Sequence, residues 1–240
     1  MEYYQDPHHR IQADIALRIG KIALQYDVMP RPPQEDFSVT LHLCILQNLL
    51  TNCVELFDAM SRPAQRELGL CALHEKDAPW GLAEIKIVRN TFEEKLTAAQ
   101  ILRHIRNAMS HPTGTDLTSP FSSTGYNSIP DGSGSISSIV FSSSPDTKRN
   151  RHRTWAKPEQ AKAHLARIRG SNEKSFPHIM AEQSADGAYG LFRHGEPFAR
   201  EFVAILSTTQ IRSLVLGLSN LLAQPADEHF DGRSFRQLVA

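Results

Sequence analysis

The stretch TAAQILRHIRNAMSHP, residues 97–112, decides the expected fold of this chain. Thr97 and Gln100 have the spacing of a helix-capping box, and Pro112 is a residue before which a helix ends. Between them apolar residues recur at helical spacing, which places them on one face. These residues are Ala98, Ile101, Leu102, Ile105, Ala108 and Met109. The stretch therefore predicts an amphipathic helix that packs against a core.

Three further segments predict long helices around this one. Residues 11–26 have apolar residues at helical spacing, and residues 38–61 are apolar nearly all round, which is typical of a central bundle helix. A last amphipathic helix is expected to begin at Thr208 or Thr209 and to end before Pro225. Together these helices predict a mainly α protein, a helical bundle with a small β-containing insertion between the central helix and the last one.

The segment after the central helix has a different composition. It contains no Lys, Arg or Glu from residue 112 to 147, and 11 of the 26 residues from 119 to 144 are serine. Such a composition buries too little apolar surface to offset the entropy of ordering. We therefore expect a mobile loop there, with one short strand at 136–141.

Three more elements complete the expected organisation. A helix begins at Pro158, and strands at 188–192 and 202–206 are expected to pair through a turn at Gly195. The chain then divides into a bundle, a flexible Ser-rich and basic insertion, a closing strand and helix, and a tail. Their ranges are 1–112, 113–199, 200–224 and 225–240.

The charge of the chain is balanced overall but not locally. It has 26 Lys+Arg and 26 Asp+Glu, which excludes a uniformly basic nucleic-acid binder. Residues 148–169, however, include eight Lys and Arg against one acid. Either this run is a solvated helix face, or it contacts an RNA backbone. In the second case the expected RNA-binding residues are Arg103, Lys148, Arg149, Arg151 and Arg153.

Several kinds of site and location are not expected. The three cysteines form no C-x-x-C pair and the histidines lack ligand spacing, so we expect neither a metal nor a cofactor. No stretch approaches the roughly 18 consecutive apolar residues of a membrane span, and the N-terminus lacks the pattern of a signal peptide. We therefore expect a cytoplasmic protein that does not enter a membrane.

The end of the central helix gathers several polar side chains. Arg103, Asn107 and His111 lie on one stripe opposite the apolar face, and Arg106 is one step round the helix. A guanidinium stays charged at physiological pH, and an imidazole exchanges a proton there. The structural alternatives are a salt-bridged arginine and a histidine that caps the helix.

The string Arg-Asn-Ala-x-x-His at residues 106–111 resembles the signature of the HEPN superfamily. Those proteins are all-α domains, and many are metal-independent ribonucleases of bacterial defence and toxin systems. The resemblance covers about residues 1–112 and 200–224, and the motif is its sharpest part. Thr113 stands where one toxin–antitoxin branch has a tyrosine.

The resemblance implies an endoribonuclease in which Arg106 and His111 are catalytic and Asn107 orients or binds. The ribose 2′-hydroxyl would attack the phosphodiester and leave a 2′,3′-cyclic phosphate. RNA as substrate is implied, as is a homodimer that brings two Arg–His pairs into one composite site. An antitoxin or sensor protein as partner is implied by the resemblance alone. Glu55 and Asp58 are expected to orient Arg106.

Two other functions are compatible with this sequence. A catalytically inactive HEPN-fold module would bind RNA, a nucleotide or a protein partner without turnover. A purely structural scaffold would not bind RNA. The ends of the RNA products distinguish the enzyme from both.

Overall fold

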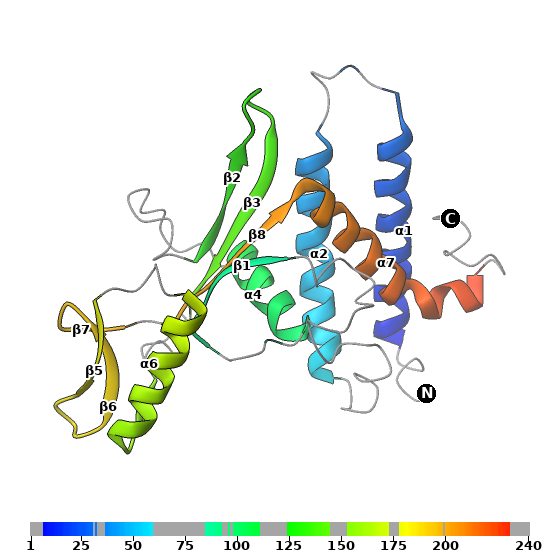
Figure 1. The fold of residues 1–240 in the computed structure, drawn as a ribbon. Helices are drawn as coiled ribbons and strands as arrows, with labels where there is room; N and C mark the ends of the chain where they lie inside the picture. Colours follow the sequence, from blue (N-terminus) through cyan, green and yellow to red (C-terminus); the bar gives the residue numbers. More distant parts are fainter. Residues whose placement is uncertain are drawn as a thin grey trace.

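The computed structural model of the chain describes residues 7–30, 32, 37–59, 85–92, 96, 98–110, 124–144, 153–172, 178–198 and 200–230. Its elements form a mixed α and β architecture with two antiparallel sheets (Figure 1). The helices are α1 (Pro7–Val28), α2 (Ser38–Ala59), α4 (Ala98–Ser110), α6 (Pro158–Asn172) and α7 (Thr208–Phe230). The strands are β1 (Lys86–Asn90), β2 (Gly125–Pro130), β3 (Ile136–Ser143), β4 (Thr154–Trp155), β5 (Ile179–Gln183), β6 (Tyr189–Arg193), β7 (Glu196–Pro197) and β8 (Phe202–Ser207).

The first sheet has the strand order β1-β8-β3-β2. Its neighbouring strands are antiparallel, with Ile139 opposite Leu206 and Phe141 opposite Ala204. Residues directly opposite each other share one face of a sheet, and all four of these are buried. This face of the sheet is therefore one wall of the main core.

The main hydrophobic core lies between this sheet and the helices α1, α2, α4 and α7. Its α4 residues are those that the helical spacing predicts, and the predicted central helix is confirmed from Ala98 to Ser110. Burial of each Leu or Ile side chain stabilises the fold by about 1.5–3 kcal/mol. The apolar face of α4 thus fixes the orientation of its polar side chains. The buried residues of this face are Ile101, Leu102, Ile105, Ala108 and Met109.

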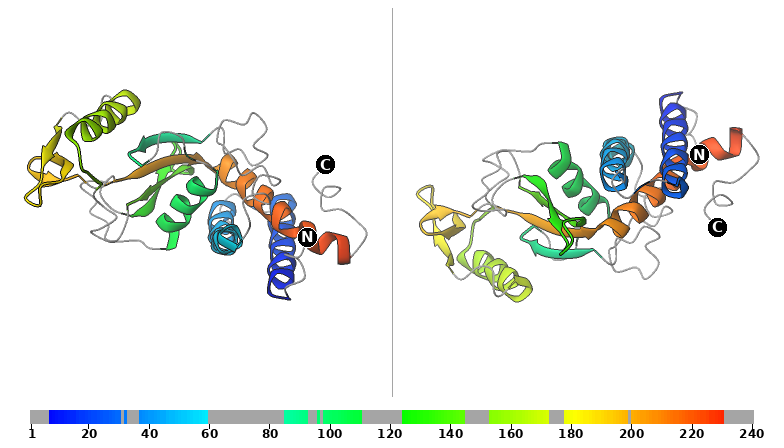
Figure 2. Two further views of the ribbon diagram at one scale, coloured as in Figure 1. Left: turned by 90° about the horizontal axis from the view of Figure 1, so that it is seen from below. Right: turned by 90° about the horizontal axis from the view of Figure 1, so that it is seen from above.

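A smaller unit lies at the end of the molecule opposite α1 (Figures 1 and 2). It consists of α6 packed on the sheet β4-β6-β5, with β7 paired to β6. The predicted helix that begins at Pro158 is confirmed and continues to Asn172. This unit has a small core of its own, formed by Leu165, Ile168, Ile179, Leu191 and Phe198.

The expectation of a mainly α fold is wrong, because the strands do not form a small addition to a bundle. β8 lies between β1 and β3 in the interior of the first sheet. The mobile loop expected over 112–147 is wrong for residues 125–130, which form β2 and pair with β3 in a hairpin, while 112–123 and 145–147 lie outside the described residues. The predicted strand at 136–141 is confirmed. Ile139 and Phe141 fall on one face of β3, so this face enters the core although the composition of the stretch is polar.

The expected pairing of strands 188–192 and 202–206 is also wrong. β6 belongs to the second sheet, whereas β8 pairs with β1 and β3 in the first. The turn at Gly195, with a φ of 81°, closes the short hairpin β6–β7 instead. α7 continues through Pro225 to Phe230, beyond its expected end, and its ribbon bends in this last part (Figure 1). A proline inside a helix removes one hydrogen bond and kinks the helix.

Candidate functional site

The C-terminal half of α4 carries two of the predicted catalytic residues, Arg106 and Asn107, and both are half-buried. Nη1 of Arg106 donates to Oδ1 of Asn107 across 3.3 Å. Nε of Arg106 is buried and has no hydrogen-bond partner among the described residues. A buried donor without an acceptor destabilises a fold by about 1–3 kcal/mol. The Arg106 guanidinium is therefore held in place by its bond to Asn107, and its Nε–H has no acceptor among the described residues.

The remaining predicted site residues are placed only in part. Outside the described residues are His111, Lys148, Arg149 and Arg151. Glu55 and Asp58 belong to α2, which packs against α4, but their side chains lie outside the described part of the structure. Arg103 and Arg153 are both exposed. Of the predicted set, the structure thus brings together Arg106 and Asn107.

His104 of α4 is packed among aromatic rings rather than presented to solvent. Its ring stacks on Phe202 with a centroid distance of 4.6 Å, and the Phe92 ring lies tilted at 4.6 Å. Its Nδ1 lies 3.3 Å from Oγ of Ser143 in β3. The side chain therefore fastens the polar edge of α4 to the first sheet.

Four arginines from separate segments lie near Phe92, His104 or His164, and we call them the arginine cluster. They are Arg103 of α4, Arg153 before β4, Arg167 of α6 and Arg200 before β8. The guanidinium carbon of Arg200 lies 5.0 Å from the centroid of the Phe92 ring. Nη2 of Arg167 donates to the carbonyl oxygen of Phe92 across 3.3 Å. Phe92 thus joins α6 to the segment that precedes β8.

The second histidine, His164, extends this contact toward Trp155. Nη2 of Arg167 lies 3.2 Å from Nδ1 of His164, and the rings of His164 and Trp155 are 4.9 Å apart. The guanidinium carbon of Arg153 lies 5.6 Å from the centroid of the Trp155 ring. A continuous row of cations and aromatic rings therefore extends from α6 to β4.

The pKa values of both histidines respond to burial and to these charges. Burial is the largest cause that lowers the pKa of His104 to about 4, and Arg103 and Arg200 add to it. Burial likewise lowers the pKa of His164 to about 4, with three members of the arginine cluster adding to it. Both rings are neutral near pH 7, so neither is a suitable proton carrier there.

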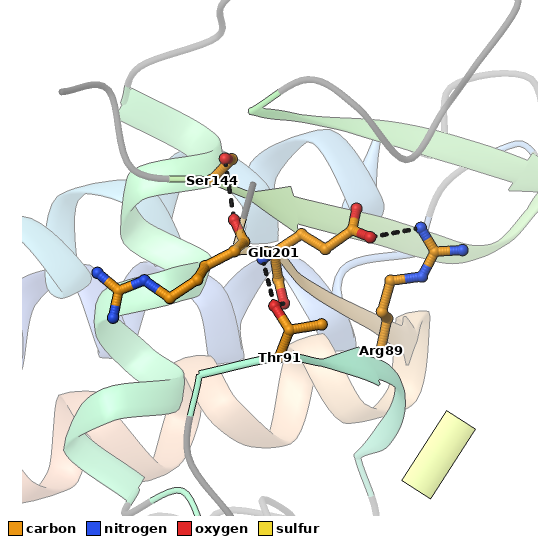
Figure 3. A network of polar contacts seen from close by, with 5 residues as sticks. Arg89, Thr91, Ser144 and Glu201 are labelled. Atoms are coloured by element: carbon orange, nitrogen blue, oxygen red, sulfur yellow. Dashed lines mark hydrogen bonds and ion pairs between the residues drawn. The ribbon is translucent and has the colours of Figure 1, made fainter. Parts of the chain in front are cut away.

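A buried polar junction connects the end of β1 to the start of β8 (Figure 3). The backbone N–H of Glu201 donates to Oγ1 of Thr91 across 2.7 Å, and that of Thr91 donates to the carbonyl of Glu201 across 3.0 Å. Nη1 of Arg89 donates to Oε1 of Glu201 across 2.8 Å, and Oγ of Ser144 donates to the carbonyl of Arg200 across 3.0 Å. Burial raises the pKa of Glu201 to about 7, although Arg89 acts in the opposite direction. The junction therefore fixes the backbone from which Arg200 extends.

Arg167, Arg200 and Glu201 were not among the residues that the sequence indicated. The local excess of basic residues at 148–169 includes Arg167, so charge was the one available signal for it. For Arg200 and Glu201 no local pattern exists, because their partners include Arg89, Thr91 and Phe92, more than a hundred residues earlier in the chain.

Comparison of the chain with protein-family models, with curated proteins and with solved structures gives no significant match. Among the described residues, no group of three or more His, Cys, Asp or Glu side chains could hold a metal ion. Nor is any helix in that part of the chain both long and apolar enough to cross a membrane. The residues of the chain itself are therefore the basis on which a function is inferred.

Proposed function

We propose that this chain is a metal-independent endoribonuclease whose reaction centre consists of Arg106, Asn107 and His111. The observation that supports the proposal is the hydrogen bonding and burial of the Arg106 guanidinium. Its guanidinium is bonded to Asn107 across 3.3 Å and keeps a buried Nε–H without an acceptor among the described residues. Two phosphate oxygens can accept from Nε and Nη of one guanidinium at once. When the Arg106 side chain moves so that Nε reaches solvent, a phosphodiester supplies the missing acceptor and neutralises a partly desolvated cation.

In the proposed reaction the ribose 2′-oxygen forms a bond to phosphorus while the bond from phosphorus to the 5′-oxygen breaks. A base takes the proton of the 2′-hydroxyl, and an acid protonates the leaving 5′-oxygen. Arg106 stabilises the charge that develops on the non-bridging oxygens, and His111 exchanges one of the two protons. The products are a 2′,3′-cyclic phosphate and a 5′-hydroxyl end.

One imidazole cannot accept one proton and deliver another in the same step. The proposal therefore includes a homodimer, in which the His111 residues of two copies serve one phosphodiester, as the HEPN resemblance implies. Glu55 and Asp58 orient Arg106 from α2 in this proposal. An antitoxin or sensor protein in the cytoplasm would control the activity.

Incubation of the purified protein with total RNA in EDTA tests this proposal. Arg106→Ala and His111→Ala should each reduce cleavage at least about 100-fold. The thermal unfolding midpoint should not fall in Arg106→Ala, because the substitution removes a buried unsatisfied donor. The exposed residues Arg18 and His178 provide matched controls, Arg18→Ala and His178→Ala, which should cleave like the wild type.

The ends of the products decide between the candidate functions. Cyclic phosphate ends that form in EDTA support the nuclease. Undiminished cleavage by either Arg106→Ala or His111→Ala, or activity that EDTA removes, would contradict it. RNA that the wild-type protein binds and leaves intact would identify the catalytically inactive module instead.

A further inference from the structure

We infer that the arginine cluster and Trp155 form a binding track for single-stranded RNA that leads to the end of α4. The inference rests on the proposed function for its choice of RNA, and it deepens that function by assigning residues that hold the strand beside the reaction centre. The sequence already indicated Arg103, Arg153 and the basic run 148–169, which contains Trp155 and Arg167, for RNA; Arg200 and the order of the contacts come from the structure.

The part of the track on the smaller unit is continuous. Arg153 lies over the Trp155 ring at 5.6 Å, and that ring lies 4.9 Å from His164. Arg167 follows, with Nη2 at 3.2 Å from Nδ1 of His164. Trp155 and His164 are only partly buried, so this row of rings and cations borders solvent.

The second part of the track lies beside the first sheet and begins at Arg167, where the part on the smaller unit ends. Arg167 bonds to the carbonyl of Phe92 across 3.3 Å, and the Phe92 ring lies 5.0 Å from the Arg200 guanidinium carbon. Arg103 is close enough to lower the pKa of His104, which itself packs on Phe92. Asn107 follows Arg103 by four residues, about one helical turn and about 6 Å along α4. The row of cations therefore ends one turn before the proposed reaction centre.

A nucleic-acid strand carries one phosphate at every nucleotide, and guanidinium groups held at separate positions along the track can each bind one of these phosphates. The backbone around Arg200 is held by Ser144 and by the Thr91–Glu201 junction, so less conformational entropy is lost when this arginine binds. Partly exposed rings between the cations can stack on unpaired bases, whereas a duplex presents its phosphates but no free base faces. The combination favours a single strand over a duplex.

Fluorescence anisotropy with a labelled single-stranded RNA of about 12 nucleotides tests the track. A His111→Ala background and EDTA keep the probe intact. Arg153→Gln, Arg167→Gln and Arg200→Gln should each weaken binding about fivefold and reduce the salt slope by about 0.7. The matched control is Arg169→Gln, because Arg169 also lies on α6 and donates to a backbone carbonyl, that of Ile179, across 2.8 Å. This control removes the same charge outside the track and should bind almost as tightly as its parent.

Trp155 gives a second readout. The chain has two tryptophans, so in a Trp80→Phe variant the fluorescence reports on Trp155 alone and should be quenched by the RNA. Equal binding of single strand and duplex, or absence of quenching, would overturn the single-strand assignment. Equal losses in Arg169→Gln and Arg167→Gln, or no loss in the exposed Arg153→Gln, would overturn the track.

The outcomes separate this inference from the proposed function. A wild-type protein that binds through the arginine cluster but never cuts RNA refutes the nuclease and leaves the track standing. A protein that cuts RNA through Arg106 and His111 but binds it equally well without the cluster refutes the track alone.

Discussion

The two hydrophobic cores of the molecule differ in how many elements they join. The main core connects α1, α2, α4 and α7 to the first sheet, so a displacement of α4 disturbs all of them. The small core connects α6 only to the second sheet. Units with few buried apolar contacts open at lower free energy than a core that spans the fold. Arg106 is therefore expected to lie on the more stable unit, whereas Arg153 and Arg167 belong to the unit that is expected to open at the lower free energy.

The largest effect is expected when the main core is broken at Phe202. This ring is fully buried and stacks on His104 at 4.6 Å. Phe202→Ala should lower the free energy of unfolding by about 3–5 kcal/mol, measured by urea denaturation. Phe198→Ala, the matched change in the small core, should lower it less, because the Phe198 side chain is not completely buried. A larger loss in Phe198→Ala would reverse the ranking of the two cores.

A somewhat smaller effect is expected at Glu201, in the segment that links the two cores. A carboxyl group in the unfolded chain loses its proton near pH 4.5, but burial holds the proton on Glu201 up to about pH 7. The folded state therefore binds more protons than the unfolded state in this window, and the free energy of unfolding falls as pH rises from 4.5 to 7. The full change is about 3 kcal/mol at most.

Glu201→Gln isolates this contribution. The difference in free energy of unfolding between wild type and Glu201→Gln should change across the window. A constant difference for Glu201→Gln would show that the carboxyl group is ionised in the folded state throughout.

Two matched Ile→Val substitutions, one in each core, should each lower the free energy of unfolding by about 1 kcal/mol. Ile105 of α4 and Ile168 of α6 are both completely buried. Ile105→Val should speed hydrogen exchange of the slowest amides in every element of the main core, because they exchange by global unfolding. Ile168→Val should speed exchange only in α6 and the second sheet. Acceleration of the whole molecule by Ile168→Val would mean that the two cores unfold as one.

The smallest effect is expected for the change that Arg200→Gln makes to the titration of His104 and His164, followed by NMR. Each should stay neutral until the pH falls to about 4, so the stability that the neutral ring contributes is complete above pH 6.5 and is lost as pH falls toward 4. Burial is the main cause for both, and Arg200 lowers both pKa values further. Arg200→Gln should therefore raise both midpoints. A shift of only one would place Arg200 beside that histidine alone.

The first hairpin shows why part of the fold escaped prediction. Oδ1 of Asp131 accepts hydrogen bonds from the backbone N–H groups of Ser133 and Ser135 at 2.8 and 3.0 Å, and Gly134 has a φ of 87°. A turn rich in Asp, Gly and Ser is a recognisable signal for such a hairpin. The serine content of the flanking strands concealed it, because their apolar positions are few.

β1 offered even less local information. It has five residues, and its place at the edge of the first sheet depends on β8, which comes more than a hundred residues later. The candidate site divides in the same way. The placement of Arg106 and Asn107 on one helix could be expected from the sequence. Their hydrogen bond could not, because adjacent helix residues do not face each other, and neither could the arginine cluster, which assembles from four separate segments.

The helix α4 and its buried face follow from the sequence alone, because helical spacing is a property of consecutive residues. Only the tertiary structure decided that β8 enters the first sheet, that Glu201 is buried beside Arg89, and that Arg200 approaches Phe92. These contacts depend on which strand edges meet. That choice is made by burial across the whole fold rather than by any local pattern.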